Sequence, residues 1–573
     1  MKPDNEHNDK PENKESQNLL IKGDNIEVLK HLKYAYTGAI KMIYIDPPYN
    51  TGSDGFVYQD DRKFTPTELA ELANVTIEEA KRILSFTEKG SNSHSAWLTF
   101  MYPRLYVARQ LLKEDGVICI SIDENEQAQL KILCDEVFGE ECYVGDFFWQ
   151  KKTGASDAKD MAIITEYAIF YKKESSVTAF NLNSNSYDLN RYKLKDEFLE
   201  ERGPYYLDNL DRGGLQYSDS LNYFILCPDG EKTYPNGRSE FINDGWIWKW
   251  SKEKVKWGVE NGFIEFRKST TKESGWAVCY KNYLNVDNKN QPIDRGAPYK
   301  NLIQVVLNSD GNSDVKELFN GQVVFSYPKP VEFIKTILQT AIKDNEYVLD
   351  FFAGSGTTAH AIIELQLKTK TNYRFILVQL NELLDKSNSK HTIAIEYCKE
   401  NVVEPTVFSI TKARLEKVIS KIKAENPEYK GDLGFKIFET KPLPERYNDE
   451  IERLEKSTEL FYAKDIVKDD LDAILTTWGL FDNIKLTDNF IPINLDGYEA
   501  YFAKETLYLM YPEFGMAQTK ALIRKMEDDS SFVVEKIVLF AHNFDSKQQR
   551  ELEEAMVSFR NKKSVDINVI KRY

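Results

Sequence analysis

The chain has 573 residues, of which 42% are hydrophobic and 29% charged, as in an ordinary soluble globular protein. Because one hydrophobic core rarely serves more than about 250–300 residues, several domains are expected. A net charge of −16, taken alone, argues against a nucleic-acid partner. No apolar run is long enough to span a membrane, and the scattered cysteines and histidines predict a cytoplasmic protein with no disulfide framework and no metal site.

The charge is unevenly distributed along the chain. Residues 145–300 hold 23 Lys+Arg and 23 Asp+Glu, so the rest of the chain carries the entire negative excess. A locally neutral middle is explained either by chance or by a surface that faces a polyanion.

The first elements predict a βαβ unit. Residues 1–17 are polar and charged, and we expect a disordered leader there. A strand over 19–25 ends in Gly-Asp, a helix over 26–34 follows, and residues 41–45 form a short buried strand. This order implies parallel pairing with a right-handed crossover. An amphipathic helix is then expected over 97–113.

A second group of elements extends this region. We expect a strand over 116–123 and a helix over 126–138. Strands over 144–149 and 167–171 predict an antiparallel edge pair. From about residue 175 the apolar periodicity weakens, and aromatic residues alternate with basic ones, as in Trp246-Ile247-Trp248-Lys249-Trp250. These aromatics form either the core of an irregular insert or a DNA-facing surface, and at least one of the tryptophans is expected in the core.

Regular α/β texture returns with a strand over 346–352, a Gly-rich turn over 353–358, a helix over 359–367 and a strand over 373–380. This is the first βαβ unit of a Rossmann-like sheet, yet it comes late in the chain. A doubly wound sheet that was cut open and rejoined has this order. We therefore expect one Rossmann-like α/β sheet in permuted order, split by an insert.

The predicted domains follow from these changes in texture. One α/β domain comprises segments 18–174 and 320–405, and residues 175–319 form the insert. Residues 406–573 are expected to form a separate, small α/β domain in which nothing suggests catalysis.

Two loops carry the chemistry. Asp46-Pro47-Pro48-Tyr49 follows a buried strand at once, and its prolines fix a stiff loop that presents a carboxylate, a backbone carbonyl and an aromatic ring. Gly354 and Gly356 let the backbone approach a ligand, as in NAD, FAD or other nucleotide sites, although each loop alone is also a fair turn sequence. The absence of Gly-Lys-Ser/Thr excludes a P-loop here. Glu382, after the next strand, is placed to hold a ribose diol.

Together the two loops are specific. The chain resembles the beta class of DNA amino-methyltransferases, in which an Asp-Pro-Pro-Tyr motif precedes the glycine loop. Further stretches carry the same resemblance: Gly23-Asp24-Asn25, Trp97–Arg104, Ser121-Ile122-Asp123, Tyr327-Pro328-Lys329-Pro330, Gln379–Glu382 and Gly434-Phe435-Lys436. As a whole it resembles the modification subunit of type III restriction–modification systems.

The resemblance implies a function and its residues. It implies methyl transfer from S-adenosylmethionine to the N6 amine of a flipped-out adenine in double-stranded DNA, target recognition by the insert, a homodimer and a restriction (helicase–nuclease) subunit as partner. A solitary methyltransferase is the alternative. The implied catalytic residues are Asp46, Pro47, Pro48 and Tyr49. The implied cofactor-binding residues are Asp24, Lys329, Asp350, Phe352, Gly354, Gly356, Thr357 and Glu382.

Simpler roles remain open for two of these residues, because Asp24 also suits a helix cap and Lys329 a surface lysine. A DNA-binding protein without catalysis is disfavoured by the intact Asp46 loop. A Rossmann oxidoreductase leaves that loop unexplained.

Overall fold

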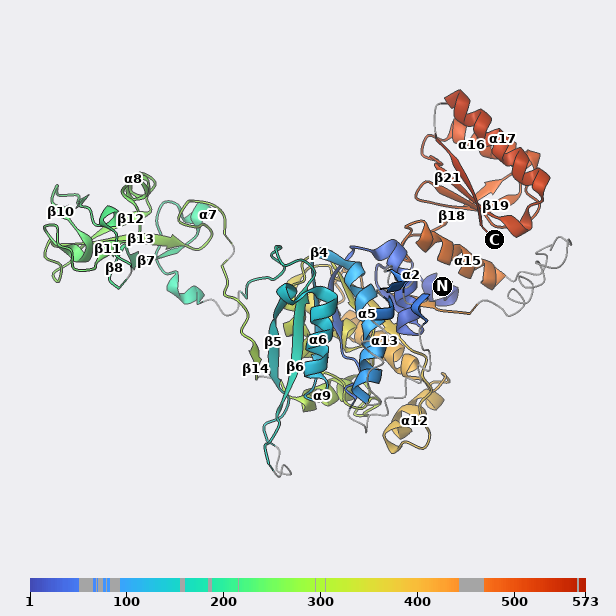
Figure 1. Cartoon of the computed structure of the whole chain (residues 1–573), viewed down its shortest axis with the longest axis horizontal. Coiled ribbons are helices and arrows are strands. Elements are labelled where there is room, and N and C mark those ends of the chain that lie inside the picture. Colours follow the sequence, from blue (N-terminus) through green and yellow to red (C-terminus); the bar gives the residue numbers. More distant parts are fainter. Residues whose placement is uncertain are drawn as a thin grey trace. The chain divides into compact units, whose positions relative to one another are not determined.

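The structure, a computed structural model, describes part of the chain in detail. The described residues are 1–50, 65–67, 70, 76–78, 80–82, 93–154, 160–183, 188–214, 216–293, 295–304, 306–442, 468–563 and 566–572. The chain divides into two compact units, one comprising residues 1–180 and 300–573 and the other residues 181–299. Helices and strands are labelled in Figure 1. No helix in the described ranges is both long and apolar enough to cross a bilayer.

A ten-stranded mixed sheet forms the centre of the first unit. In spatial order its strands are β1 (Lys2–Pro3), β17 (Lys436–Glu439), β2 (Leu19–Lys22), β16 (Arg374–Gln379), β15 (Tyr347–Asp350), β3 (Ile40–Ile45), β4 (Leu112–Ile122), β6 (Thr165–Lys172), β5 (Tyr143–Gln150) and β14 (Leu302–Ile303). The strands from β17 to β4 are parallel, as the predicted βαβ units require. The expected antiparallel pair β5–β6 is present, but β14 pairs with β5, so β5 is not an edge strand.

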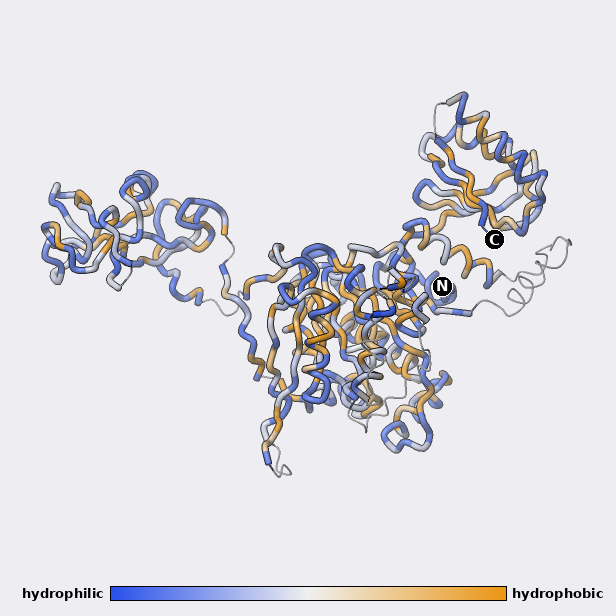
Figure 2. Tube along the Cα trace, viewed as in Figure 1, coloured by the Kyte–Doolittle hydropathy of each residue, from blue (hydrophilic) through white to orange (hydrophobic). Residues whose placement is uncertain are grey.

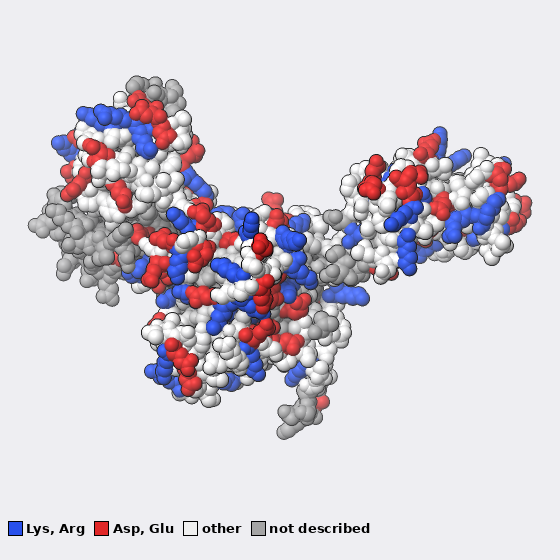
Figure 3. Space-filling view, turned by 180° about the vertical axis from the view of Figure 1, so that it is seen from behind, with Lys and Arg blue, Asp and Glu red and all other residues white. Residues whose placement is uncertain are grey.

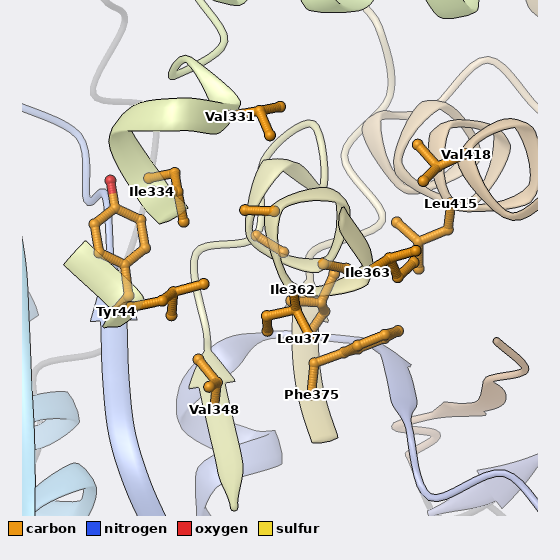
Figure 4. Close-up of a cluster of buried hydrophobic side chains, with 14 of the residues drawn as sticks. Tyr44, Val331, Ile334, Val348, Ile362, Ile363, Phe375, Leu377, Leu415 and Val418 are labelled. Atoms are coloured by element: carbon orange, nitrogen blue, oxygen red, sulfur yellow. The ribbon is translucent and has the colours of Figure 1, made fainter. Parts of the chain in front are cut away.

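Successive residues of the central strands point to opposite faces, and each face has its own apolar core. In β3, for example, Ile43 and Ile45 belong to one core while Met42 and Tyr44 belong to the other. The first core is covered by α2 (Asn25–Tyr36), α5 (Ser93–Leu111) and α6 (Gln127–Phe138). The second is covered by α9 (Asn308–Leu318), α10 (Val331–Gln339), α11 (Thr357–Thr369) and α13 (Val407–Glu425). Figure 4 shows α10, α11 and α13 contributing to this second core, and Figure 2 shows apolar residues concentrated along the strands.

The order of the strands brings the two chemical loops to one edge of the sheet. β15 lies between β16 and β3, with parallel pairing on both sides. Because parallel neighbours end at the same edge, the loop after β3 and the turn after β15 are adjacent. The expectation that two segments distant in sequence build one sheet is confirmed.

The leader expected to be disordered over residues 1–17 is instead ordered. β1 pairs with β17, and α1 (Asn5–Asn8) follows it. The side chains of Asn8 and Asn13 bond to the backbone at Ile437 and Phe435. The polar composition was misleading because these amides satisfy main-chain groups of the neighbouring strand instead of remaining in water.

The expected domain boundary at residue 405 also differs from the structure. β17 lies in the central sheet beside β2, and α13 covers the second core. The prediction failed because α13 is rich in charged residues, whereas its inward face is apolar.

A second sheet lies further along the chain, with strand order β18–β19–β20–β21–β22. Its elements are α15 (Lys468–Phe481), β18 (Ile491–Leu495), β19 (Tyr498–Ala503), β20 (Thr506–Leu509), α16 (Met516–Asp528), β21 (Lys536–Phe540), α17 (Ser546–Lys563) and β22 (Asn568–Arg572). Two apolar clusters lie against this sheet. This is a small α/β fold.

The unit of residues 181–299 has its own core. A three-stranded sheet has the order β12–β13–β7. The elements of the unit are α7 (Leu199–Arg202), β7 (Tyr205–Asn209), β8 (Asp211–Arg212), β9 (Ile225–Leu226), β10 (Lys232–Thr233), β11 (Ile247–Trp248), α8 (Lys252–Glu260), β12 (Ile264–Lys268) and β13 (Trp276–Tyr283). Trp248 and Trp250 are buried in this core, as expected for at least one of the tryptophans, while Trp246 is half-buried.

Candidate active site

The loop after β3 is held in place from several sides. Trp97, on α5, donates from Nε1 to the carbonyl of Pro48 over 2.7 Å. Asn50 has a φ of 58° and donates to the buried carboxylate of Glu126. The Asp46 side chain is 28% exposed, so a ligand can reach its carboxylate. A stiff backbone therefore presents an accessible carboxylate at the edge of the sheet.

Lys329 donates hydrogen bonds to the loop after β3, which is the predicted catalytic loop. Its Nζ lies 2.9 Å from each carboxylate oxygen of Asp46 and 2.7 Å from the hydroxyl of Tyr49. The Tyr49 hydroxyl in turn donates to Asp46 Oδ1 over 2.7 Å. Lys329 was expected near the cofactor, and the structure places it against Asp46 and Tyr49 of the predicted catalytic motif. It is 11% exposed and is therefore no ordinary surface lysine.

Two charged residues that sequence reasoning missed complete this network. Glu166, on β6, lies 3.5 Å from Lys329 Nζ and accepts a hydrogen bond from Lys151 over 3.0 Å. The four side chains form the alternating series Lys151, Glu166, Lys329, Asp46. A buried glutamate in an otherwise apolar strand was the one signal in the sequence that could have indicated Glu166.

The titration behaviour follows from this arrangement. Burial tends to raise the pKa of Glu166, but Lys329 and Lys151 hold that pKa below its usual value. Burial tends to lower the pKa of Lys329, but Asp46 and Glu166 raise it. Burial, with the charges of Asp46 and Glu166, raises the pKa of Tyr49 well above its usual value. Lys329 therefore stays cationic and Tyr49 stays neutral near neutral pH.

The glycine turn after β15 needs its glycines. Gly354 and Gly356 have φ values of 52° and 81°, in the left-handed region. A Cβ on Gly356 would lie 2.8 Å from Leu415 Cδ1, whereas a Cβ on Gly354 would have no neighbour closer than 3.6 Å. Gly356 is thus required for packing against α13, while the backbone at Gly354 remains approachable.

Asp350 ends β15 as a buried acid. It accepts hydrogen bonds from the backbone N–H of Phe352 and from Thr358 Oγ1. Burial, with a contribution from the charge of Asp46, raises the pKa of Asp350 to about 7 even though both donors lower it. A carboxyl group in this state favours a positively charged ligand, which would stabilise its anion.

Residues of α13 support the turn and were not predicted. Arg414 is 1% exposed, and its Nη1 donates to Ser355 Oγ and Thr357 Oγ1 over 2.7 and 2.8 Å. Thr411 Oγ1 donates to the carbonyl of Gly354. Thr357 therefore shapes the turn through Arg414. Polar residues on the apolar face of a helix were the available signal.

Asp24 lies at the start of α2 and acts as its N-cap, accepting from the backbone N–H of Ile26. The guanidinium of Arg104 lies 3.8 Å from its other oxygen and also donates to Asn25. Asn25 donates to the carbonyl of Phe351, next to the glycine turn. The cap and the ligand role are compatible, since the Asp24 side chain is 28% exposed.

The remaining predicted residues lie at the same edge of the sheet. Phe352 packs its ring against Phe100 and Phe351. Glu382 follows β16, and its side chain is exposed. Together with Asp24, Asp350 and the glycine turn, these residues offer acids and an open backbone to a cationic nucleoside, and so they fit S-adenosylmethionine.

The unit of residues 181–299 has a cavity of about 670 Å³, whose lining includes Arg212, Gly213, Trp246 and Lys249. The side chain of Arg212 is exposed. On the face shown in Figure 3, basic and acidic side chains are interspersed over this unit with no single large basic patch. On this face, the local charge neutrality noted in the sequence reflects charges of both signs that lie interspersed.

Known proteins share both the sequence and the domain composition. Residues 40–402 match the family model described as DNA methylase, and residues 469–565 match the type III R-M EcoP15I C-terminal domain. The EcoP15I Mod subunit of Escherichia coli is 38% identical over 99% of this chain and 87% of its own length. The EcoPI Mod subunit of Escherichia phage P1 is 36% identical over 99% of this chain and 88% of its own. The chain belongs to the DNA methylases that use S-adenosylmethionine and, among them, to the modification subunits of type III restriction–modification enzymes.

Proposed function

We propose that this enzyme methylates the N6 amine of adenine in double-stranded DNA and that Asp46 accepts a hydrogen bond from that amine. One observation carries the proposal. Within the described part of the chain, Asp46 Oδ1 accepts from both Tyr49 and Lys329, whereas Oδ2 accepts from Lys329 alone. Because a carboxylate has about four acceptor positions, Oδ2 retains capacity for a further donor.

The chemistry needs such an acceptor. The lone pair of an adenine amine is delocalised into the ring, which makes the amine a weak nucleophile. Hydrogen bonds from its two N–H groups to Asp46 and to the carbonyl of Pro47 favour a more tetrahedral nitrogen. Asp46 also stabilises the positive charge that develops on this nitrogen, and the proton leaves afterwards. Tyr49 offers its ring for stacking to a base that has left the duplex.

When bound, S-adenosylmethionine supplies an electrophilic methyl group on a cationic sulfur. Asp350 and the open backbone at Gly354 would hold its amino-acid part, while Asp24 and Glu382 would hold the adenosine. Phe352, Gly356 and Thr357 shape this site through packing and through Arg414. Lys329, which donates to Asp46, would offer its positive charge to the methionine carboxylate.

The partners proposed are duplex DNA, read by residues 181–299, a restriction subunit and a second copy of this chain. The match of residues 469–565 to the EcoP15I C-terminal domain supports a restriction–modification assembly. Co-purification with the restriction subunit, and light scattering of the purified chain, test the two protein partners. A chain that methylates alone and recruits no restriction subunit would favour the solitary enzyme.

Transfer of labelled methyl groups to DNA tests the central proposal. We expect incorporation in adenine within one sequence context, mapped by long-read sequencing of DNA from expressing cells. Asp46→Ala should lose transfer while still binding S-adenosylmethionine and DNA. Full activity in Asp46→Ala, or label found in cytosine, would overturn the mechanism or the base assignment respectively.

A further inference from the structure

The charged series that ends at Asp46 contains two residues with no role in the chemistry described so far. Glu166 is 8% exposed, and its two oxygens face different lysines. Oε1 accepts from Lys151 over 3.0 Å, while Oε2 lies 3.5 Å from Lys329. A buried carboxylate between two cations, next to a catalytic loop, invites a functional explanation.

Tyr49 does not account for Glu166. Its hydroxyl lies 2.7 Å from Asp46 Oδ1 and 3.4 Å from Glu166 Oε2. A hydroxyl has one proton to donate, and the shorter contact takes it. Within the described residues, Lys329 is therefore the cation that faces Glu166 Oε2.

Lys329 is thus shared between two carboxylates. Its Nζ is closer to Asp46, at 2.9 Å, than to Glu166, at 3.5 Å. If Glu166 lost its charge, Asp46 would be the one remaining anion for Lys329 in this series, and the ion pair would tighten. The same carboxylate must accept the amine of the substrate, so a tighter pair with Lys329 weakens it as an acceptor.

We propose that Glu166 is a positioning residue that balances the charge of Lys329 and so keeps Asp46 available to the adenine amine, while Lys151 limits how much of the charge of Glu166 acts on Lys329. This inference rests on the proposed function of Asp46. Lys151 acts in the opposite direction to Glu166. It pairs with Glu166, which weakens the attraction of Glu166 for Lys329 and strengthens the pair of Lys329 with Asp46.

Opposite charges predict opposite shifts in pH dependence. The groups that face Asp46 are Lys329, Tyr49, Tyr44 and Asp350, with Glu166 acting through Lys329. Glu166→Gln removes a negative charge from the Lys329–Asp46 network, so we expect the acidic limb of the methylation rate to move to lower pH. Lys151→Met removes a positive charge from the same network, so we expect that limb to move to higher pH. The double variant restores the balance.

The test is the pH profile of single-turnover methylation by the full chain, with S-adenosylmethionine and DNA saturating. Because S-adenosylmethionine is saturating, effects of protonation on its binding, including protonation of Asp350, do not change the measured rate. We expect Glu166→Gln to lower the rate at neutral pH about tenfold and to move the acidic limb down by about half a pH unit. Lys151→Met should move that limb up by a similar amount, and the double variant should return it close to that of the natural protein.

A purely structural role would give a different pattern. Thermal unfolding and donor affinity are measured for every variant, so a folding defect is recognised directly. If Glu166→Gln folds poorly, the upward shift in Lys151→Met decides alone. Shifts in the same direction for both single variants, or no shift in Lys151→Met, would overturn the inference. An active Asp46→Ala would instead overturn the proposed function, so the two failures are distinct.

Discussion

Asp46 and Asp350 lie at the carboxyl ends of two neighbouring parallel strands, β3 and β15, and the charge of Asp46 contributes to the raised pKa of Asp350. Burial is the larger cause, and together they bring the pKa of Asp350 to about 7. Asp46, by contrast, is paired with Lys329. Two acids at one edge of a sheet thus have different environments, one suited to accepting an amine and the other to holding a cation.

Binding of S-adenosylmethionine should therefore depend on pH near neutrality. Below pH 7 Asp350 is increasingly protonated and attracts the cationic ligand less, so the Kd should rise up to about tenfold between pH 8 and pH 6. Isothermal titration calorimetry measures this. Asp350→Asn has no such group and reports the titration of the ligand itself. Parallel pH dependence in the two proteins would contradict the prediction.

The same carboxyl group predicts a pH dependence of stability. The pKa of Asp350 is raised from 3.8 to about 7, mainly by burial, so the folded state holds a proton that the unfolded state releases within this window. Stability therefore falls as pH rises from about 4 to about 7, by an amount on the order of 1–4 kcal/mol. The melting temperature of Asp350→Asn minus that of the natural protein should therefore increase from pH 5.5 to pH 8. A decrease in this difference from pH 5.5 to pH 8 would contradict the predicted direction of the pH dependence.

The regular part of the fold was predictable from the sequence because its signals are local. Apolar runs lead into Asp46 and Asp350; prolines follow Asp46 at once, and Gly354 comes within one turn after Asp350. The two loops could be paired because parallel strands place their carboxyl ends together, and the structure bears this out through β3 and β15.

Contacts between distant segments were not predictable. The sequence gives no periodic signal that the polar residues Asn8 and Asn13 would bond to the strand near Ile437. The position of Arg414 on the apolar face of its helix signals burial, but nothing in the sequence indicates that its partner is Thr357. Such polar contacts depend on three-dimensional packing, and they account for the error at residues 1–17.

Arg414 supplies a test of the helix that supports the glycine turn. Replacing it with leucine leaves Ser355 and Thr357 without their shared donor, and we expect a loss of about 1–3 kcal/mol in stability together with weaker S-adenosylmethionine binding. Lys412→Leu is the matched control, since Lys412 lies on the same helix in a long contact of 4.0 Å with Glu416. It should change stability by less than about 1 kcal/mol. Equal effects of the two substitutions, in thermal unfolding and calorimetry, would deny Arg414 this role.

Substitution of Gly356 tests whether this turn needs a glycine for its backbone conformation alone or also for packing. Gly356→Ala forces a side chain into a left-handed backbone, with φ 81°, and also against Leu415 Cδ1 at 2.8 Å. Gly38→Ala is the matched control, because its φ is 66° and a Cβ there would have no neighbour within 4 Å. We expect Gly38→Ala to cost about 1–2 kcal/mol in the free energy of unfolding from the backbone alone. Gly356→Ala should cost more and should also weaken S-adenosylmethionine binding, because Leu415 is buried and cannot move away without disturbing α13. Denaturant unfolding measures the free energy of unfolding, and calorimetry measures the affinity for S-adenosylmethionine. Equal losses of stability in the two variants, with unchanged affinity in Gly356→Ala, would show that the turn tolerates a side chain at Gly356 and does not form the S-adenosylmethionine site.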